Sequence, residues 1–129
     1  KTANDNTLVV VQIETAEAVE NVDEIFSVEG VDAGFIGPAD LSISMGIFGQ
    51  LDHPKFKEAL DKILVAGKKH GVAVGMHVQT SEAAIERIRQ GMQFVALSSE
   101  LGHAIAGAKK AFGEVYDATG KAVGMKREA

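Results

Sequence analysis

Two acidic residues, Glu14 and Asp40, each follow a short apolar run that is typical of a β-strand. The runs are 8–13 and 31–36, and the segment between them has helical spacing. A strand–helix–strand unit is right-handed with parallel, often adjacent strands, so we expect both carboxylates at one edge of a sheet. Neighbouring strands lie about 4.8 Å apart, which lets two such groups converge on one ion. The pair predicts a site for a magnesium-type cation with positions left open for substrate and water.

The elements that would position this pair form four strand-then-helix units. The expected strands are 8–13, 31–36, 72–78 and 94–97. The expected helices are 16–29, 54 to about 70, a third that contains 82–86 in its first turns and is closed by Gly91, and 104–116. The run 8–13 is continuously apolar, which predicts a strand buried on both faces. The segment 37–51 is punctuated by glycines, and we expect a long loop there.

Residues at the helix ends support these boundaries. Thr15 and Asp52 are expected N-caps, and Thr80 or Ser81 is expected to cap the third helix. Gly30 and Gly71 are expected to end the first and second helices as C′ residues.

Alternating strands and helices predict an α/β fold with a parallel sheet. Two closures fit this order: a doubly wound open sheet, or part of a (β/α)₈ barrel. A whole barrel takes about 250 residues, so four units in 129 residues amount to half of one. We expect a single α/β unit over 1–129, with a flexible tail at 121–129. In a half-barrel, 8–13 and 94–97 are bare edge strands that invite pairing with another chain.

Composition restricts the class of protein. The net charge of −5 argues against a nucleic-acid partner, and no apolar run is long enough to suggest a membrane span. The absence of cysteine suits the cytoplasm, where we expect the protein, and rules out thiolate metal sites. The first seven residues are polar and do not have the pattern of a signal peptide.

Four short motifs resemble one enzyme family when taken in order. They are Val-Gln-Ile-Glu-Thr at 11–15, Gly-Val-Asp at 30–32, Phe-Ile-Gly-Pro-Ala-Asp-Leu-Ser at 35–42 and Ser-Glu-Leu-Gly at 99–102. Together they resemble the C-terminal half of the metal-dependent pyruvate aldolases of the HpcH/HpaI family. The resemblance runs from about residue 8 to residue 116. It implies a carbon–carbon lyase with a (β/α)₈ barrel that forms homo-oligomers.

The resemblance also implies roles for individual residues. Glu14 and Asp40 match the family's two carboxylate ligands of a divalent metal, Mg²⁺, Mn²⁺ or Co²⁺. The backbone amides of Ala39 and Asp40 match those that bind the carboxylate of pyruvate. Gln12 shares a strand face with Glu14 and is expected to act beside the metal as a catalytic residue. His77 falls on a pocket wall where relatives often carry an apolar residue, and we expect it to touch substrate.

The implied reaction makes or cleaves a 4-hydroxy-2-oxo acid from pyruvate, or another 2-oxo acid, and an aldehyde. The metal acts as a Lewis acid for the enolate. A His–Asp pair and an Arg complete the family's site, and all three belong to the other half of the barrel. Arg87 and Arg89 fall on a helix and are not expected to replace that Arg. We therefore predict a metal platform that is incomplete without an N-terminal half. The alternative is a non-catalytic, self-associating half-barrel that at most binds a divalent metal.

Several other polar residues are expected to have structural roles at helix ends or at the surface. His53 is expected at the surface near a helix start, and His70 at a helix C-terminus where the helix dipole favours a cation. His103 is expected near the start of the last helix. Ser98 or Ser99 is expected to cap that helix.

Overall fold

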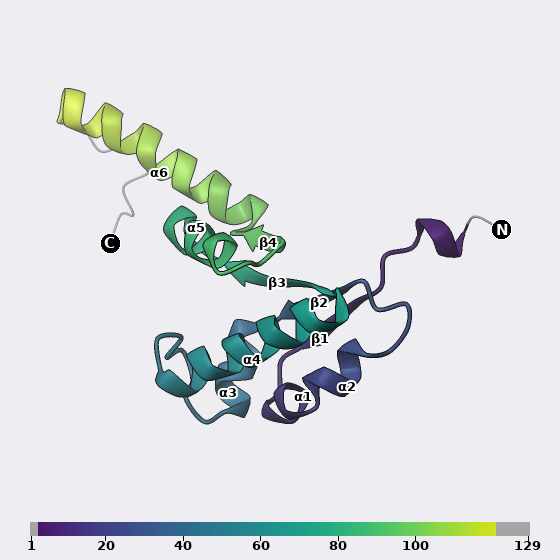
Figure 1. Cartoon of the computed structure of the whole chain (residues 1–129). Helices are drawn as coiled ribbons and strands as arrows, with labels where there is room; N and C mark the ends of the chain where they lie inside the picture. The colour runs from purple at the N-terminus through teal and green to yellow at the C-terminus, as the bar shows by residue number, and fades with distance from the viewer. Residues whose placement is uncertain (1–2, 121–129) are drawn as a thin grey trace. The chain divides into compact units, whose positions relative to one another are not determined.

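The structure, a computed structural model, describes residues 3–120 (Figure 1). These fall into a first unit that ends at Leu97 and a second that begins at Ser98. The first unit contains η1 (Asn4–Asn6), β1 (Val10–Ile13), α1 (Ala16–Glu20), α2 (Val22–Phe26), β2 (Ala33–Ile36), α3 (Pro38–Ser44), α4 (Pro54–His70), β3 (Ala73–Val78), α5 (Ser81–Arg89) and β4 (Phe94–Leu97). The second contains α6 (Glu100–Thr119).

The four strands form one parallel sheet in the order β1-β2-β3-β4. Each strand therefore pairs with the next one in the sequence, and all four carboxyl ends lie at one edge. In register, Gln12 pairs with Phe35, Phe35 with Gly75, and Gly75 with Phe94. The prediction of an α/β fold with a parallel sheet is confirmed.

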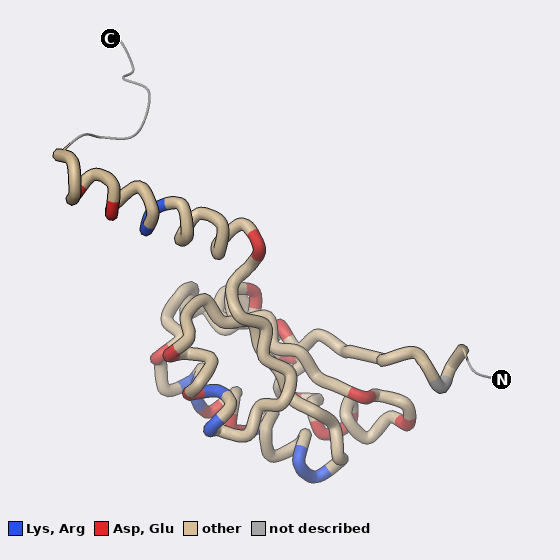
Figure 2. Tube along the Cα trace, turned by 90° about the horizontal axis from the view of Figure 1, so that it is seen from above, with Lys and Arg blue, Asp and Glu red and all other residues tan. Residues whose placement is uncertain are grey.

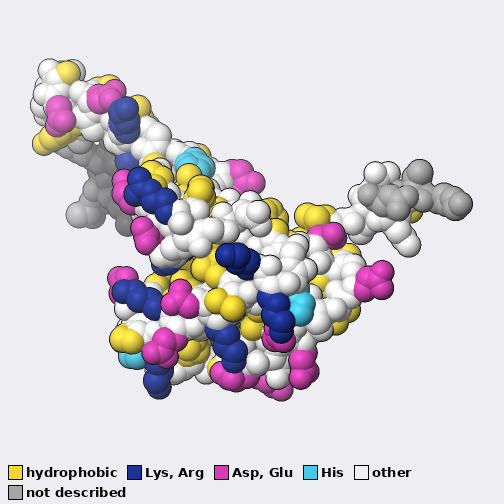
Figure 3. All heavy atoms as spheres, in the orientation of Figure 1, with side chains coloured by type: hydrophobic (Ala, Val, Ile, Leu, Met, Phe, Trp, Pro, Cys, Tyr) yellow, Lys and Arg dark blue, Asp and Glu magenta, His cyan; other side chains and the backbone are white. Residues whose placement is uncertain are grey.

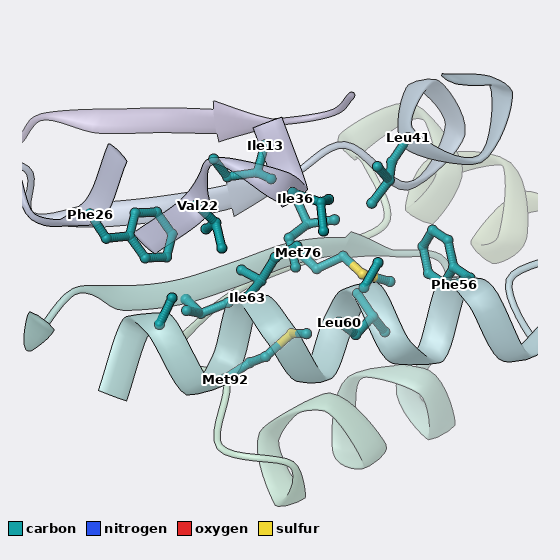
Figure 4. Close-up of a cluster of buried hydrophobic side chains, with 14 of the residues drawn as sticks. Ile13, Val22, Phe26, Ile36, Leu41, Phe56, Leu60, Ile63, Met76 and Met92 are labelled. Carbon is teal, nitrogen blue, oxygen red and sulfur yellow. The ribbon is translucent and has the colours of Figure 1, made fainter. Parts of the chain in front are cut away.

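One face of the sheet packs against helices and forms the core (Figure 4). Phe56, Leu60 and Ile63 on α4 are 0–2% exposed, and they lie against apolar side chains of the strands. The strand side chains of this face include Ile13, Ile36 and Met76. We call this side of the sheet the helical face. Its burial is the main source of stability of the first unit.

The opposite side, which we call the open face, carries Val10, Gln12, Phe35, Phe94 and Ala96, which line a shallow hollow. No helix of the first unit covers it, and Val10 and Phe94 remain 40% and 41% exposed. The rings of Phe35 and Phe94 meet edge to face with centroids 5.5 Å apart, although β3 separates their strands. They meet because Gly75 places no side chain between them; a Cβ there would collide with the backbone of Phe94.

The expectation that strand 8–13 is buried on both faces is therefore wrong. Ile13 is 1% exposed on the helical face, whereas Val10 lies on the open face and Leu8 and Val9, before β1, are also exposed. A continuous apolar run predicts two covered faces, and only one is covered within the first unit.

The expected helix 16–29 is two short helices, α1 and α2, which meet at Asn21. Asn21 has φ −95° and ψ 9°, outside the helical range, and ends one helix while starting the other. Asparagine is unfavourable in the interior of a helix because its side chain competes for backbone hydrogen bonds. Ser27 ends α2, so Gly30, which has a positive φ of 90°, lies in the following turn and is not the C′ residue.

The expected loop 37–51 contains the helix α3, with Pro38 at its first position. Proline suits this position because a backbone N–H there has no intrahelical acceptor, so the helix loses no hydrogen bond when the N–H is absent. The buried Ser42 hydroxyl donates to the Ala39 carbonyl (2.7 Å) and accepts from the Gly49 amide (3.1 Å), which ties the rest of the segment to α3. The N-cap of α4 is His53, whose Nδ1 accepts from the Lys55 amide, and not Asp52.

Other expected helix ends are confirmed. Thr15 caps α1 by accepting from the Ala18 amide at 3.0 Å, and Thr80 caps α5 by accepting from the Ala83 amide at 3.2 Å. Gly71 ends α4 with φ 70°, which glycine adopts without strain.

In the second unit, α6 is longer than the expected 104–116. Ser99 caps it by accepting from the Gly102 amide at 3.1 Å, as one of the two serine alternatives predicted. His103 lies in its first turns. The expected tail at 121–129 lies outside the described residues.

Charged side chains of both signs are interspersed on the outer surface (Figures 2 and 3). Lys62 and Glu20 form an ion pair at 2.7 Å. Asp23 on α2 binds two residues at the end of α4: its carboxylate oxygens lie 2.7 and 2.8 Å from Lys69 Nζ, and Oδ1 lies 2.9 Å from His70 Nε2. Among residues 3–120, no helix combines the length and apolarity needed to cross a bilayer.

Phe56 and Phe48 test where the core lies. Phe56 is 0% exposed and Phe48 is 71% exposed. We expect Phe56→Ala to lower the free energy of unfolding by about 3–5 kcal/mol, because a buried ring is lost and a cavity remains. Phe48→Ala, the matched control, should change it by less than about 0.5 kcal/mol. Urea denaturation measures both, and equal effects would contradict the proposed core.

The Asp23 cluster predicts a pH effect. Hydrogen bonds from Lys69 and His70 hold the pKa of the Asp23 carboxyl below its ordinary value. The stabilisation is therefore present above the unfolded pKa of about 3.9 and is lost as pH falls through the lower folded pKa. We expect Asp23→Asn to lower the melting temperature at pH 7, with the difference from wild type closing below about pH 4.

The control for this experiment is Asp61→Asn, at an exposed position of α4. It removes the same charge and should give no comparable pH-dependent difference. A melting-temperature difference for Asp23→Asn that is constant from pH 7 to pH 3 would contradict the role of this carboxylate.

Candidate metal and substrate site

Glu14 directly follows β1, and its carboxylate is held by the strand. Glu14 Oε2 accepts a hydrogen bond of 2.6 Å from Gln12 Nε2. This confirms the prediction that the two side chains share a face. The bond fixes one oxygen of the Glu14 carboxylate. Glu14 is half-buried, which suits a ligand that is both oriented and accessible.

Gly37, which directly follows β2, lies against the same two side chains. A Cβ on Gly37 would sit 3.0 Å from Glu14 Oε2 and 3.1 Å from Gln12 Nε2. The Gly37 amide also donates to the Ile13 carbonyl at 3.2 Å, continuing the pairing of β1 with β2. Glycine is needed here for space and not for its backbone freedom, because its φ is −88°. The ends of the two strands therefore meet closely, as the sequence predicts for a parallel pair.

Asp40 lies in the first turn of α3 and is exposed. The amides of Ala39 and Asp40 are in this same turn, where an α-helix offers no carbonyl partner. Such amides, together with the helix dipole, favour a negative group. Ser44 at the other end of α3 accepts from the Ala16 amide at 3.0 Å. The helix that carries Asp40 is thus attached to the first residue of α1, two positions after Glu14.

His77 is in β3, one residue before its carboxyl end, and pairs in register with Ala96. This register places it on the open face with Ala96, and it is half-buried. It therefore lies near the same edge of the sheet as Glu14. Contact between His77 and a substrate remains a prediction.

The donor set at this edge consists of carboxylate and amide oxygens. Within residues 3–120, no group of three or more His, Cys, Asp and Glu side chains is arranged to hold a metal. Glu14 and Asp40 are the acidic side chains on the connections that directly follow β1 and β2. Mg²⁺ and similar cations commonly bind through one or two carboxylates and keep several waters. The residues present fit an open site of that kind.

Arg87 is the residue near this edge that sequence reasoning did not assign to any site. It lines a hollow of about 360 Å³ together with Ala39, His77 and Thr80. Its Nη1 donates to Gln90 Oε1 at 2.7 Å, and its Nε is buried without a hydrogen-bond partner among the described residues. The spacing in the sequence could have indicated this position. Thr80, the N-cap of α5, and Ala83 and Arg87 fall on one face of the helix at i, i+3 and i+7.

The fold is that of a parallel β/α barrel protein, and the candidate site lies at the carboxyl ends of its strands. Two acidic residues lie there, each on the connection that follows one of two neighbouring strands. The family model for HpcH/HpaI aldolase/citrate lyase matches residues 1–107, and the chain belongs to this family. The resemblance predicted from the sequence is confirmed.

Two relatives and one solved structure illustrate the similarity. The chain is 43% identical over 95 residues to 4-hydroxy-2-oxo-heptane-1,7-dioate aldolase of Escherichia coli, covering 74% of this chain and 36% of that protein. It is 38% identical over 108 residues to 5-keto-4-deoxy-D-glucarate aldolase of Salmonella arizonae, covering 84% and 42%. A HpcH/HpaI family structure from Burkholderia cenocepacia aligns with a TM-score of 0.85 at 37% identity, covering 88% and 44%.

These comparisons confirm the barrel family and the aldolase class of the relatives. The chain spans about two-fifths of the length of the relatives it matches. Its similarity is to part of a carbon–carbon lyase.

Gly37→Ala tests the close approach at the site. The added methyl group has to displace Gln12 or Glu14, because both lie at 3.0–3.1 Å. We expect the affinity for Mn²⁺ to fall about tenfold or more, as when the groups that orient a metal ligand are disturbed. Gly113→Ala is the control, since its Cβ would meet nothing within 4 Å. Calorimetric titration with Mn²⁺ measures both, and an unchanged affinity in Gly37→Ala would contradict the site.

Proposed function

We propose that this chain carries the metal- and 2-oxo-acid-binding half of an aldolase site. The whole enzyme would cleave or form 4-hydroxy-2-oxo acids from pyruvate, or a related 2-oxo acid, and an aldehyde. The observation that carries the proposal is the packing of Glu14 and Gln12 on Gly37, beside the helix whose first turn contains Asp40. Family membership supports the reaction class.

In this proposal each residue has one task. Glu14 and Asp40 hold a divalent cation, and Gln12 orients Glu14 through the 2.6 Å hydrogen bond. The amides of Ala39 and Asp40 bind the carboxylate of the 2-oxo acid, aided by the dipole at the start of α3. His77 forms part of the wall on the β3 side. The cation, when bound, supplies Lewis-acid polarisation of the ketone.

Ligand type supports Mg²⁺, Mn²⁺ or Co²⁺ about equally, because hard oxygen donors discriminate weakly among them. The proton-transfer groups expected for the family, a His–Asp pair and an Arg, do not correspond to residues of this chain. We therefore propose that turnover requires the further barrel units that the relatives contain. Location in the cytoplasm and assembly into a homo-oligomer stay predictions.

The test is thermal unfolding with Mn²⁺, with and without oxalate as a mimic of the pyruvate enolate. A ligand at about 100 times its Kd stabilises the folded state by about 2.7 kcal/mol, which shifts the melting temperature measurably. We expect a shift that requires Mn²⁺ and grows with oxalate. Asp40→Asn and Glu14→Gln should each remove it, since each deletes one anionic ligand.

The matched control is Asp52→Asn, because the Asp52 side chain is fully exposed and lies before α4. It should keep the full shift. Retention of the shift in both Asp40→Asn and Glu14→Gln would mean that Mn²⁺ binds elsewhere, and the metal assignment would be wrong.

A further inference from the structure

The hollow of about 360 Å³ beside the candidate site, which we call the Arg87 hollow, is formed by inner elements of the first unit. Its lining residues come from α3, the segment 45–53, β3 and the connection that leads to α5, and α5 itself; none comes from β1 or β4. Ala39, whose amide belongs to the candidate substrate site, is one of them. The volume is within the range of pockets that bind small molecules.

The charge of this hollow comes from one residue. Of the residues that line it, Arg87 is the one Lys, Arg, Asp or Glu. Its guanidinium is held by a neutral amide, because Nη1 donates to Gln90 Oε1 at 2.7 Å while Gln90 Nε2 donates to Glu86 Oε1 at 2.8 Å. The ion pairs among residues 3–120 do not include Arg87. The positive charge of Arg87 is therefore positioned without a carboxylate from the described chain to neutralise it.

The Nε atom of Arg87 gives an independent observation. It is buried and has no acceptor in the described part of the chain, whereas buried polar groups are almost always hydrogen-bonded. An unpaired buried donor costs free energy, and more so when it belongs to a charged group. A ligand oxygen that accepts from this donor removes that cost. Carboxylates suit a guanidinium especially well, because two of its N–H groups can donate to the two oxygens in parallel.

We propose that Arg87 is a specificity-determining residue that binds a carboxylate on the aldehyde substrate. The inference rests on the proposed function, and it assigns the 2-oxo acid to the amides at the start of α3 and the acidic end of the aldehyde to the Arg87 hollow. Ala39 belongs to both places, so the two substrates lie next to each other. Arg87 is distinct from the Arg expected beside the ketone, which belongs to the other half of the barrel.

The other walls of the hollow indicate what joins the carboxylate to the aldehyde. Most lining side chains are apolar, and they include Phe48, Leu51 and Met76. Burial of one CH₂ group against such walls raises affinity about fourfold. We therefore expect a short aliphatic chain between the aldehyde carbon and the carboxylate.

The test is an NMR titration of the full chain with butyrate, an unreactive mimic of such an aldehyde acid. Butyrate should shift the Nε–H signal of Arg87 and bind about tenfold or more tightly than butyramide, its neutral analogue, because a charge-assisted hydrogen bond is lost in the amide. Arg87→Gln should weaken butyrate binding by about tenfold or more for the same reason. Arg87→Lys keeps the charge without the paired N–H groups and should have an intermediate affinity.

Arg89→Gln is the matched control. Arg89 is exposed on the same helix and does not line the hollow, so this variant should bind butyrate as wild type does. The spectra also report whether each variant is folded. Equal butyrate affinity in wild type and folded Arg87→Gln would overturn the inference.

Titration with Mg²⁺ and oxalate separates this inference from the proposed function. Arg87→Gln should bind oxalate as wild type does, and butyrate should bind together with oxalate. Competition between butyrate and oxalate would overturn the inference, because both carboxylates would then use the amides of Ala39 and Asp40. Tighter binding of inorganic phosphate than of butyrate would also overturn it, because the hollow would then be a site for a free anion.

A different result would count against the proposed function. If wild type bound butyrate through Arg87 but did not bind Mg²⁺ and oxalate, the metal and 2-oxo-acid site would be refuted. The assignment of the carboxylate to an aldehyde substrate would be refuted with it, and Arg87 would stand as a carboxylate ligand outside an aldolase site.

Discussion

The close approach of β1 and β2 at Gly37 is the constraint on which the candidate site depends. The Gly37 amide extends the ladder to Ile13, and its missing side chain leaves room for the Glu14 carboxylate and the Gln12 amide. The next residue, Pro38, begins the helix that carries Asp40. One glycine therefore sets the position of a carboxylate on one strand end relative to the start of the helix on the next. A larger residue there would separate the parts while the rest of the sheet stayed paired.

The two faces of the sheet explain why this chain has a well-formed core and an incomplete barrel at the same time. The helical face buries Ile13, Ile36 and Met76 beneath α4, which is enough to order the strands and their connections. The open face supplies the apolar interior that a closed barrel would bury. Packing on the helical face orders the strands and α3, and so positions Glu14, Asp40 and His77. Substrate enclosure would depend on what covers the open one.

Much of this arrangement was predictable from local sequence signals. Periodicity predicts the parallel β/α order and the shared face of Gln12 and Glu14. Capping chemistry predicts the N-caps Thr15 and Thr80. Each of these features depends on residues near one another in the chain. The pairing of Glu14 with Asp40, which lie 26 positions apart, follows from the rule that consecutive parallel strands are often adjacent, and the family resemblance supports it independently. Their roles as ligands stay predictions, as does substrate contact by His77.

The features that were not predicted depend on contacts that periodicity does not encode. The helix α3 is held by the Ser42 hydroxyl, which bonds to both Ala39 and Gly49, in a segment whose glycines suggested a loop. The exposure of Val10 depends on a missing layer and not on its own sequence. Arg87 reaches the hollow beside Ala39 only because α5 turns that face toward the sheet edge.

The most direct test of the account is anomalous diffraction from crystals grown with Mn²⁺ and oxalate. We expect a peak within about 2.0–2.3 Å of one carboxylate oxygen of Glu14 and one of Asp40, a normal range for oxygen ligands of such cations. Oxalate should then lie against the amides of Ala39 and Asp40. A Mn²⁺ peak elsewhere, with both carboxylates free of metal, would contradict the central claim that this edge of the sheet is a metal site.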